Sequence, residues 1–233
     1  MEKKNDIYPL KNIKNVHCLF EQSGTFKNAF KKLGYNAKDI DISNAYHQTD
    51  VQCNLFKEIM DTCYGKETIL RHFNEDDFVF AFFPCDYFSD QSQLVSRGDI
   101  FQSKNKTIQE KAMDAIRLST LREEYFRTLC ILIRLAGVQK FKMVVENPSG
   151  KCGFLKQYLP CTTKLIINNR SLMGDIYRKP TVFFFYNCTP TFNLMQEYTA
   201  RKTNKIAKDT RDKMERSLIS QEFAENFIRQ FLL

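Results

Sequence analysis

Long apolar runs are missing from this sequence. None of its segments reaches the roughly 18 consecutive apolar residues that a membrane-spanning helix needs. The first residues, MEKKNDIYPLKN, also lack the apolar stretch of a secretory signal. We therefore expect a soluble, cytoplasmic protein that has no membrane partner.

Paired metal-binding motifs are missing as well. The eight cysteines are scattered singly, without the CxxC spacing of a zinc site and without the density of a disulfide scaffold. The three histidines, His17, His47 and His72, show no ligand spacing. We expect reduced thiols, most of them buried as small apolar side chains, and no metal ion.

The sequence has no internal repeats and no low-complexity segment. Its 233 residues are 43% apolar, which is enough for one substantial core but short for two full domains. We predict a single domain over residues 1–233, with a small substrate-contact insertion at about residues 150–180.

Acidic residues are outnumbered. The 35 Lys and Arg residues against 27 Asp and Glu residues give a net charge of +8 and a pI near 9.0. Basic side chains beside phosphate groups gain free energy because they release counterions, so this balance suggests a nucleic acid partner. The basic residues gather after residue 97 and again over residues 201–216. The alternative for the second stretch is a solvated loop and helix face.

Apolar runs alternate with stretches of helical period, which is typical of a doubly wound α/β sheet with helices on both faces. The clearest buried strand is DFVFAFFPC, which is apolar from Phe78 through Phe83 and stops at Pro84. Residues 107–137 are expected to form one long helix or two, and the third strand is poorly defined. The other expected strands are residues 16–20, 37–42, 141–145, 164–167 and 181–186, and the other expected helices lie near residues 26–33, 55–60 and 220–232.

Polar segments follow four of the expected strands. EQSGTF follows the first, Asp39 and Asp41 end the second, PCDYFS follows the fourth, and ENP follows the fifth. In a sheet of this kind ligands bind outside the carboxyl ends of the strands, near the point where the strand order reverses. The sequence therefore predicts one ligand site at this edge of the sheet.

The order of these segments resembles that of the cytosine-5 DNA methyltransferases. In that family the first strand leads into FxGxGG, the fourth into GxPCQxFS and the fifth into a Glu-Asn dipeptide, and this sequence has FEQSGTF, FFPCDYFS and ENP at the same junctions. The Pro-Cys pair with Phe-Ser three residues on, followed by Glu-Asn, is the most specific part. The resemblance covers residues 15–150 and implies the seven-stranded, mostly parallel, Rossmann-like fold of class I S-adenosylmethionine-dependent methyltransferases.

The resemblance implies catalytic roles at two of these junctions. Cytosine carbon 5 is a poor nucleophile, and family members activate it by adding a cysteine thiolate to carbon 6. Cys85 matches that cysteine. Glu146 matches the acid that binds ring nitrogen 3 and the exocyclic amine and stabilises the charge that develops. By the same resemblance, Asn147 would orient its loop and Pro148 would shape it.

The methyl donor of the family, S-adenosylmethionine, is implied as the cofactor. Its binding loop needs close approach of the backbone, and its ribose hydroxyls favour an acidic partner at the end of the second strand. Gln22 and Thr25 stand where the family has glycines. The candidate donor contacts are Phe20, Gly24, Asp39 or Asp41, and Pro84.

The catalytic loop also departs from the family pattern. Phe82 replaces a glycine, and Asp86 replaces a glutamine beside the thiol. A neighbouring carboxylate raises the pKa of a thiol, unless Asp86 points away or pairs with a base such as Arg97.

The chain is short where large family members insert a target-recognition domain. About 70 residues separate ENP from the closing helix, so sequence-specific reading of a duplex is not predicted. NNRSLMGDIYRKPT is a candidate for a reduced substrate-contact element, and the alternative is a polar hairpin. The candidate substrate contacts are Ser89, Arg97, Pro148, Arg170, Arg178 and Lys179.

The sequence therefore predicts an S-adenosylmethionine-dependent enzyme that methylates carbon 5 of cytosine in DNA. Two alternatives stay open. One is a binding protein on a methyltransferase fold without turnover, suggested by Gln22, Thr25 and Asp86. The other is an enzyme acting on RNA or on a free pyrimidine nucleotide. Taken alone, Cys85 also fits a buried structural thiol, and Glu146 a capping carboxylate.

Overall fold

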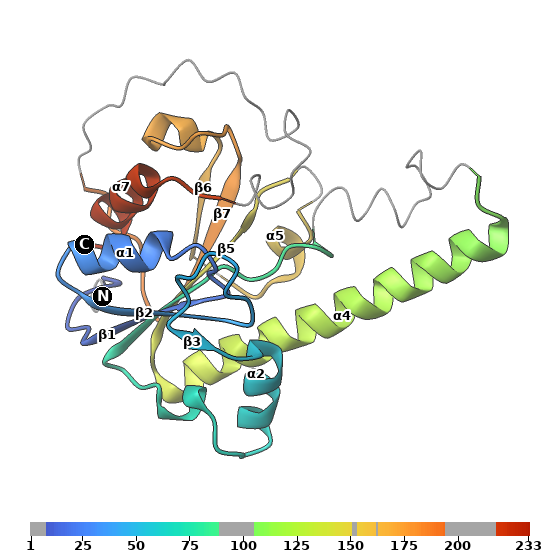
Figure 1. Cartoon of the computed structure of the whole chain (residues 1–233), viewed down its shortest axis with the longest axis horizontal. Coiled ribbons are helices and arrows are strands. Elements are labelled where there is room, and N and C mark those ends of the chain that lie inside the picture. Colours follow the sequence, from blue (N-terminus) through green and yellow to red (C-terminus); the bar gives the residue numbers. More distant parts are fainter. Residues whose placement is uncertain (1–7, 89–104, 151–152, 162, 194–217) are drawn as a thin grey trace, which may run out of the picture.

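The computed structural model describes residues 8–88, 105–150, 153–161, 163–193 and 218–233 (Figure 1). Its strands are β1 (Asn15–Leu19), β2 (Asn36–Asp41), β3 (Val51–Gln52), β4 (Asp77–Ala81), β5 (Lys142–Pro148), β6 (Thr163–Ile167) and β7 (Thr181–Tyr186). They form one sheet in the order β3-β2-β1-β4-β5-β7-β6. Strand β7 runs antiparallel to both of its neighbours, and strands β1 to β5 run parallel to one another. The predicted α/β class with a mostly parallel seven-stranded sheet is confirmed.

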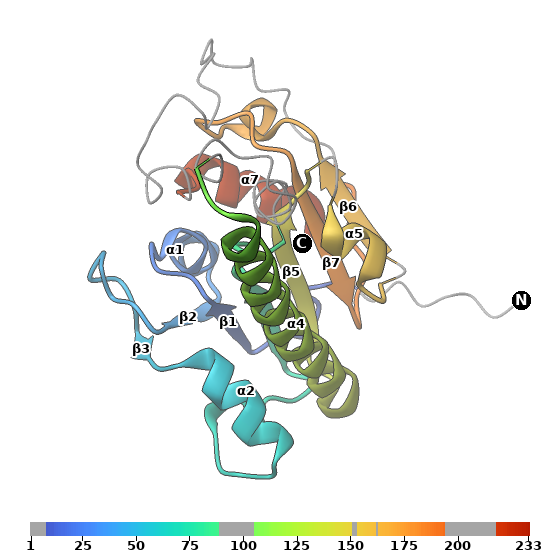
Figure 2. The same cartoon turned by 90° about the vertical axis from the view of Figure 1, so that its right-hand side faces the viewer.

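Helices cover both faces of this sheet. The α-helices are α1 (Thr25–Lys32), α2 (Leu55–Cys63), α4 (Ile108–Gln139), α5 (Phe154–Tyr158) and α7 (Gln221–Phe231), and two short 3₁₀ helices are η1 (Ile69–His72) and η3 (Arg170–Met173). Figures 1 and 2 show α1 and α7 together on one face and α2 and α4 on the other. The sheet is therefore doubly wound, as the sequence pattern predicts.

The sequence of strand β4 is a continuous apolar run because both faces of the strand are covered. Phe78 and Phe80 pack into the core on the side of α1 and α7, whereas Val79 and Ala81 pack into the core on the side of α2 and α4. Because successive side chains of a strand point to opposite faces, a strand covered on both faces needs apolar residues at every position. The ring of Phe80 lies 4.6 Å from that of Phe26 in α1.

Residues 108–139 form one helix, which is the first of the two arrangements that the sequence allows. A capping box formed by Thr107 and Glu110 starts the helix, and Gly137 lies inside it, since the chain leaves the helix at Lys140 with φ 68°. None of the described side chains between residues 108 and 127 is buried, and Figure 1 shows this half of α4 reaching away from the sheet. Although α4 is long, no helix in the described parts of the chain is both long and apolar enough to cross a membrane.

Strand β5 runs further than predicted and includes the ENP segment. Glu146, Asn147 and Pro148 pair with residues 183, 182 and 181 of β7. The prediction that ENP forms a loop after the strand is wrong. Asn-Pro is typical of a turn, and the pairing of β5 with β4 does end at Val145. The antiparallel strand β7 supplies hydrogen-bonding partners beyond that point. A proline is tolerated as the last residue of such a strand.

The segment predicted as a small insertion at residues 150–180 contains parts of the main fold. It holds α5, the outer strand β6 and the turn η3. Neither α5 nor η3 was expected from the sequence, because each is only about one turn long and leaves no periodic pattern.

Candidate active site

The strand order reverses between β1 and β4, where ligands bind in sheets of this kind. The Phe82 N–H donates to the Leu19 carbonyl over 2.9 Å, so the chains leaving the two strands stay together past the strand ends. Cys85 follows three residues later and is half-buried. The sheet thus places the predicted nucleophile at its switch point.

The loop that carries Cys85 is held by packing and by one buried hydrogen bond. Phe82, at the position where the family has glycine, packs its ring 5.0 Å from that of Phe26 in α1. The Asn147 side chain donates from Nδ2 to the Phe83 carbonyl over 3.0 Å. This contact ties the loop to β5, and it is the contact expected of a residue that orients the loop. The Phe88 N–H closes a turn on the Cys85 carbonyl at 3.0 Å.

Glu146 lies on β5 next to this loop and is 8% exposed. Its Oε1 has no hydrogen-bond partner among the described residues. Burial raises the pKa of Glu146, and Asp175 adds to this effect, while Lys179 and Arg170 act against it. The site therefore holds a carboxyl group that is biased toward its protonated form and has an oxygen left without a partner.

The Cys85 thiol and the Glu146 carboxyl are within electrostatic reach of each other. Burial raises the pKa of Cys85, Lys179 opposes this, and Glu146 and Asp86 add to it. The direction of the Asp86 effect is the one predicted from the sequence. Lys179 acts on both Cys85 and Glu146, whereas Arg170 acts on Glu146.

The remaining predicted substrate contacts separate in the structure. Lys179 is half-buried and Arg178 is exposed, while the neighbouring Pro180 carbonyl accepts from the Ser149 N–H over 2.9 Å. That hydrogen bond holds the turn with Lys179 against the end of β5, where half-buried Pro148 lies. Ser89 and Arg97 lie outside the described residues.

Arg170 takes a different position from the predicted one. Its side chain is fully buried, it forms an ion pair with Asp175, and its guanidinium carbon lies 5.0 Å from the centre of the Phe223 ring. A direct contact with a substrate does not agree with this placement. Arg170 instead lies next to Glu146, with 4.0 Å between its Nη1 and Oε1 of the carboxyl group.

The predicted donor loop follows β1. Phe20 has φ 60°, a value that a bulky residue rarely adopts and that often marks a functional constraint. Gly24 has φ 66°, and a Cβ on it would lie 3.1 Å from Cβ of Gln48. Gly24 is therefore required by the local backbone and by close packing, whether or not it contacts a ligand.

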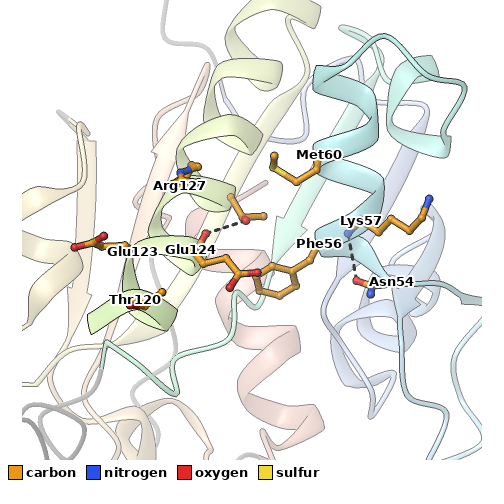
Figure 3. A pocket seen from close by; sticks show the side chains of 9 residues that line it. Asn54, Phe56, Lys57, Met60, Thr120, Glu123, Glu124 and Arg127 are labelled. Atoms are coloured by element: carbon orange, nitrogen blue, oxygen red, sulfur yellow. Dashed lines mark hydrogen bonds between the residues drawn. The ribbon is translucent and has the colours of Figure 1, made fainter. Parts of the chain in front are cut away.

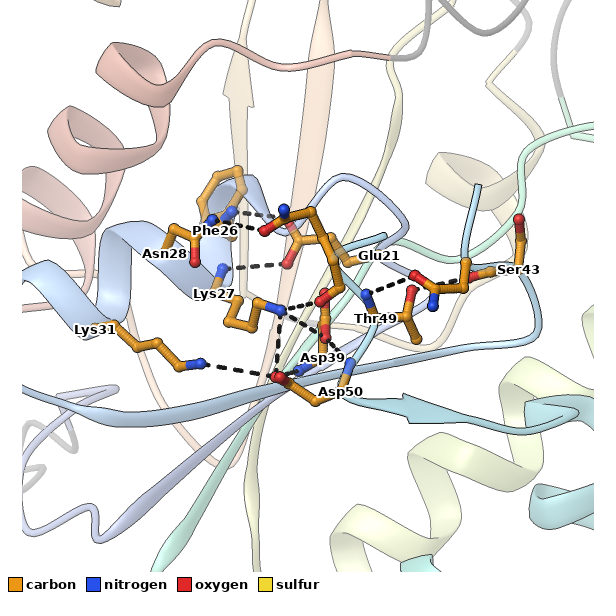
Figure 4. Close-up of polar contacts among 11 residues, drawn as sticks. Glu21, Phe26, Lys27, Asn28, Lys31, Asp39, Ser43, Thr49 and Asp50 are labelled. Carbon is orange, nitrogen blue, oxygen red and sulfur yellow. Dashed lines mark hydrogen bonds and ion pairs between the residues drawn. The ribbon is translucent and has the colours of Figure 1, made fainter. Parts of the chain in front are cut away.

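Glu21 occupies the N-terminus of α1, a position for which the sequence pattern gave no prediction. Its carboxylate accepts from the Phe26 N–H at 2.6 Å and from the Lys27 N–H at 3.1 Å (Figure 4). The start of a helix is a ready anion site, and here the chain fills it with its own carboxylate. The loop therefore does not need glycines at Gln22 and Thr25 to admit an anionic ligand group to these amides.

The two aspartates of β2 differ in their surroundings. Asp39 forms a buried ion pair with Lys27, 3.0 Å between Oδ1 and Nζ, and Lys27 also lies 3.3 Å from Asp50 (Figure 4). Asp41 is the last residue of β2 and accepts from the Ser43 N–H at 2.6 Å. Of the two predicted donor contacts, Asp39 is already bound to a cation, and Asp41 has the strand-end position that a ribose contact requires.

The buried Glu21 predicts a pH dependence of stability. Burial raises its pKa to about 7. A carboxyl whose pKa is higher in the folded state stabilises the fold most at low pH, so the free energy of unfolding should fall as pH rises from about 4.5 to about 7. The slope from one group is at most about 1.4 kcal/mol per pH unit. Urea unfolding across this range should show a flatter profile for Glu21→Gln. The control is Glu75→Gln at an exposed acid, which should keep the wild-type slope.

A cavity of about 520 Å³ lies between α2 and α4 (Figure 3). Lys57, Glu123, Glu124 and Arg127 give its lining charges of both signs, and none of the predicted site residues lines it. Its Phe56 ring lies 5.8 Å from that of Phe20. The cavity therefore borders the aromatic residues behind the donor loop but is separate from Cys85 and Glu146.

The residues that sequence reasoning missed at this edge are Glu21, Lys27, Asp50 and Asp175. Lys27 is the one charged residue among the buried positions of α1, whose other members are apolar. A lysine at such a position indicates a buried partner of opposite charge. Asp175 lies five residues after Arg170 but belongs to an irregular turn, which gives no periodic pattern. Over the described ranges no cluster of three or more His, Cys, Asp or Glu side chains could hold a metal ion.

Comparisons with known proteins add no family to this description. The chain matches none of the models of known protein families, and none of the curated proteins matches it significantly.

Proposed function

We propose that this chain is a methyltransferase of the class I, S-adenosylmethionine-dependent type that transfers a methyl group to carbon 5 of cytosine in DNA through an adduct with Cys85. The observation that carries the proposal is that Cys85, in the loop that leaves the switch point, lies within electrostatic reach of Glu146 on β5, whose buried Oε1 has no hydrogen-bond partner among the described residues. A thiol beside an acid with a free oxygen is the pair that addition to a pyrimidine ring needs.

In this mechanism Cys85 adds to the ring. The Sγ of the thiolate forms a bond with cytosine carbon 6, and the electron pair of the 5,6 double bond moves toward carbon 5, which becomes nucleophilic. Lys179 favours the thiolate because its positive charge lowers the pKa of Cys85. Once carbon 5 carries the methyl group, its proton would pass to solvent water, the electron pair of that C–H bond would restore the 5,6 double bond, and the bond between carbon 6 and Sγ would break to return the thiolate.

Glu146 supports the same addition by binding ring nitrogen 3 and the exocyclic amine. Its raised pKa favours the neutral acid, which can donate a hydrogen bond to ring nitrogen 3, while its other oxygen can accept from the exocyclic amine. Charge that develops on the ring is then stabilised by a group that carries no negative charge. Asn147 holds the Cys85 loop at the end of the same strand.

The residues around the donor loop fit S-adenosylmethionine, which when bound supplies an electrophilic methyl group. Asp41 offers a carboxylate for the ribose hydroxyls at the end of β2. Ile42, next to it, is 60% exposed and offers apolar surface for the adenine. Phe20 and Pro84, both half-buried, flank the switch point. The net charge of +8 supports a polyanionic substrate.

The proposal is tested by trapping the adduct. The protein is incubated with S-adenosylmethionine and DNA containing 5-fluorocytosine. In this base fluorine replaces the hydrogen that must leave carbon 5 as a proton, so the Cys85 adduct cannot break down. We expect a covalent complex on denaturing gels, located at Cys85 by peptide mass spectrometry and absent from Cys85→Ala.

Parallel substrates separate the alternatives. RNA containing 5-fluorocytosine and free 5-fluorodeoxycytidine monophosphate are tested beside single-stranded and duplex DNA. If an adduct forms with RNA or the nucleotide and not with DNA, the proposed chemistry is supported and the substrate is RNA or the nucleotide. The absence of an adduct with every substrate, in protein that is folded, rejects the proposal and favours a binding protein without turnover.

A further inference from the structure

The arginine next to Glu146 is held by a neighbouring aspartate. Both Nε and Nη2 of Arg170 contact Oδ2 of Asp175. The remaining nitrogen, Nη1, reaches Oγ1 of Thr181 at 3.5 Å and stays 4.0 Å from Oε1 of Glu146. A guanidinium prefers to bind a carboxylate through two parallel N–H groups. Here both nitrogens that contact Asp175 converge on one oxygen, and only Nη1 is directed toward Glu146.

Asp175 is itself fixed on every side. It is 1% exposed, and its Oδ1 accepts from the Ile176 N–H at 2.7 Å and from the Ser220 N–H at 3.3 Å. Ser220 is the N-cap of α7, so the aspartate also connects η3 to the closing helix. The ring of Phe223 from that helix packs against the Arg170 guanidinium. Both partners of the pair therefore contact α7 or its N-cap.

We propose that Asp175 is a positioning residue that holds the Arg170 guanidinium 4.0 Å from Oε1 of Glu146, too far for a hydrogen bond, so that this oxygen stays open to a ligand. The inference rests on the proposed function for its catalytic meaning. Its structural basis is the unpaired Oε1 of Glu146, which lies within 4.0 Å of a guanidinium and yet accepts no hydrogen bond from the described residues.

Charges from several elements act on Glu146. Lys179 precedes β7, Arg170 belongs to η3 and Asp175 follows it, and the Cys85 thiol faces Glu146 from the loop after β4. The residue opposite Glu146 on β7 is the neutral Phe183. The positive charge of Lys179 lowers the pKa of the Glu146 carboxyl and so favours its charged form. A second cation in direct contact would strengthen that effect, and Asp175 prevents it.

The test measures the protonation of Glu146 in the protein alone. Glutamate carboxyl carbons are labelled with carbon-13, and the Glu146 signal is identified by its loss in Glu146→Gln. In Asp175→Asn, Arg170 is free to bind Glu146, and the negative charge of Asp175, which itself raises the pKa of Glu146, is lost. Both effects should raise the acid dissociation constant of Glu146, roughly tenfold to a thousandfold in all, and Asp175→Glu, which keeps the charge, isolates the effect of position. The double variant Arg170→Met with Asp175→Asn should return it to the wild-type range. Ser220→Ala removes a cap of α7, keeps the pair and should leave the titration unchanged.

Asp175→Glu provides a second route if Asp175→Asn does not fold. It preserves the ion pair, but the extra methylene displaces the guanidinium toward Glu146, so the dissociation constant should again rise. A Glu146 titration that is unchanged in the folded variants overturns the inference, and so does a double variant that titrates like Asp175→Asn. The titration is independent of the adduct experiment. If the Glu146 titration shifts but no adduct forms, the role of Asp175 is supported and the proposed function is rejected. If the adduct forms but the titration does not shift, the proposed function is supported and the role of Asp175 is rejected.

Discussion

Replacing Cys85 with alanine is expected to reduce methyl transfer to cytosine by about 10⁴-fold or more, the loss seen when the nucleophile of a covalent mechanism is removed. The reason is that carbon 5 becomes nucleophilic only after a thiolate has added to carbon 6. Lys179 and Glu146 act on the thiol through their charges but cannot replace it, since neither carries a comparable nucleophile. Transfer of labelled methyl groups from S-adenosylmethionine to DNA, measured under single-turnover conditions, gives the rate.

The control for this prediction is Cys63→Ala, which removes an exposed thiol at the end of α2. It should keep the wild-type rate, and both variants should bind S-adenosylmethionine equally in calorimetry, since neither changes a candidate donor contact. Substantial turnover by Cys85→Ala would show that the chemistry does not use this thiol. Unchanged donor binding with lost turnover would assign the defect to the chemical step.

Much of the fold follows from the sequence because its core is built from long apolar segments. Strand β4 is buried on both faces and β7 on most of its length, and such strands leave continuous apolar runs that can be read without a structure. The end of β5 could not be read in the same way. Its ENP residues are polar or lack an amide hydrogen, and they are strand only because β7 pairs with them in the antiparallel direction. That pairing joins residues far apart along the chain, such as Glu146 and Phe183.

Part of the candidate site could also be predicted from the sequence, and part could not. Cys85, Glu146 and Asn147 lie at strand ends, so their meeting at one edge of the sheet follows from the strand order. The ion pairs that surround them do not follow from it. Lys27 reaches Asp39 across 12 positions, and the Arg170 guanidinium takes its position from Asp175 in a turn and from Phe223 in a distant helix. Local sequence gives the identity of such side chains but not their partners.

Replacing Glu146 with glutamine is expected to lower the rate of methyl transfer by about 10²- to 10⁴-fold, the range that positioned acids contribute. Glutamine keeps the shape of the side chain and its carbonyl oxygen, but it cannot present an acidic proton to ring nitrogen 3. Of the two acids that act on the Cys85 thiol, Glu146 is buried and Asp86 is exposed, so the role is assigned to Glu146. The matched control is Glu123→Gln on the exposed side of α4, which should retain the wild-type rate.

The pH profile separates the acid role of Glu146 from a merely structural one. Because burial raises the pKa of Glu146, the neutral acid persists to higher pH than for an exposed glutamate. Burial also raises the pKa of Cys85, so the rate should rise with thiolate formation at low pH, level off once Glu146 loses its proton, and fall only above the pKa of Cys85. In Glu146→Gln the falling limb should disappear, and the rate should follow thiolate formation alone. A falling limb that survives in this variant would contradict the role of Glu146, because glutamine has no proton to lose in that range.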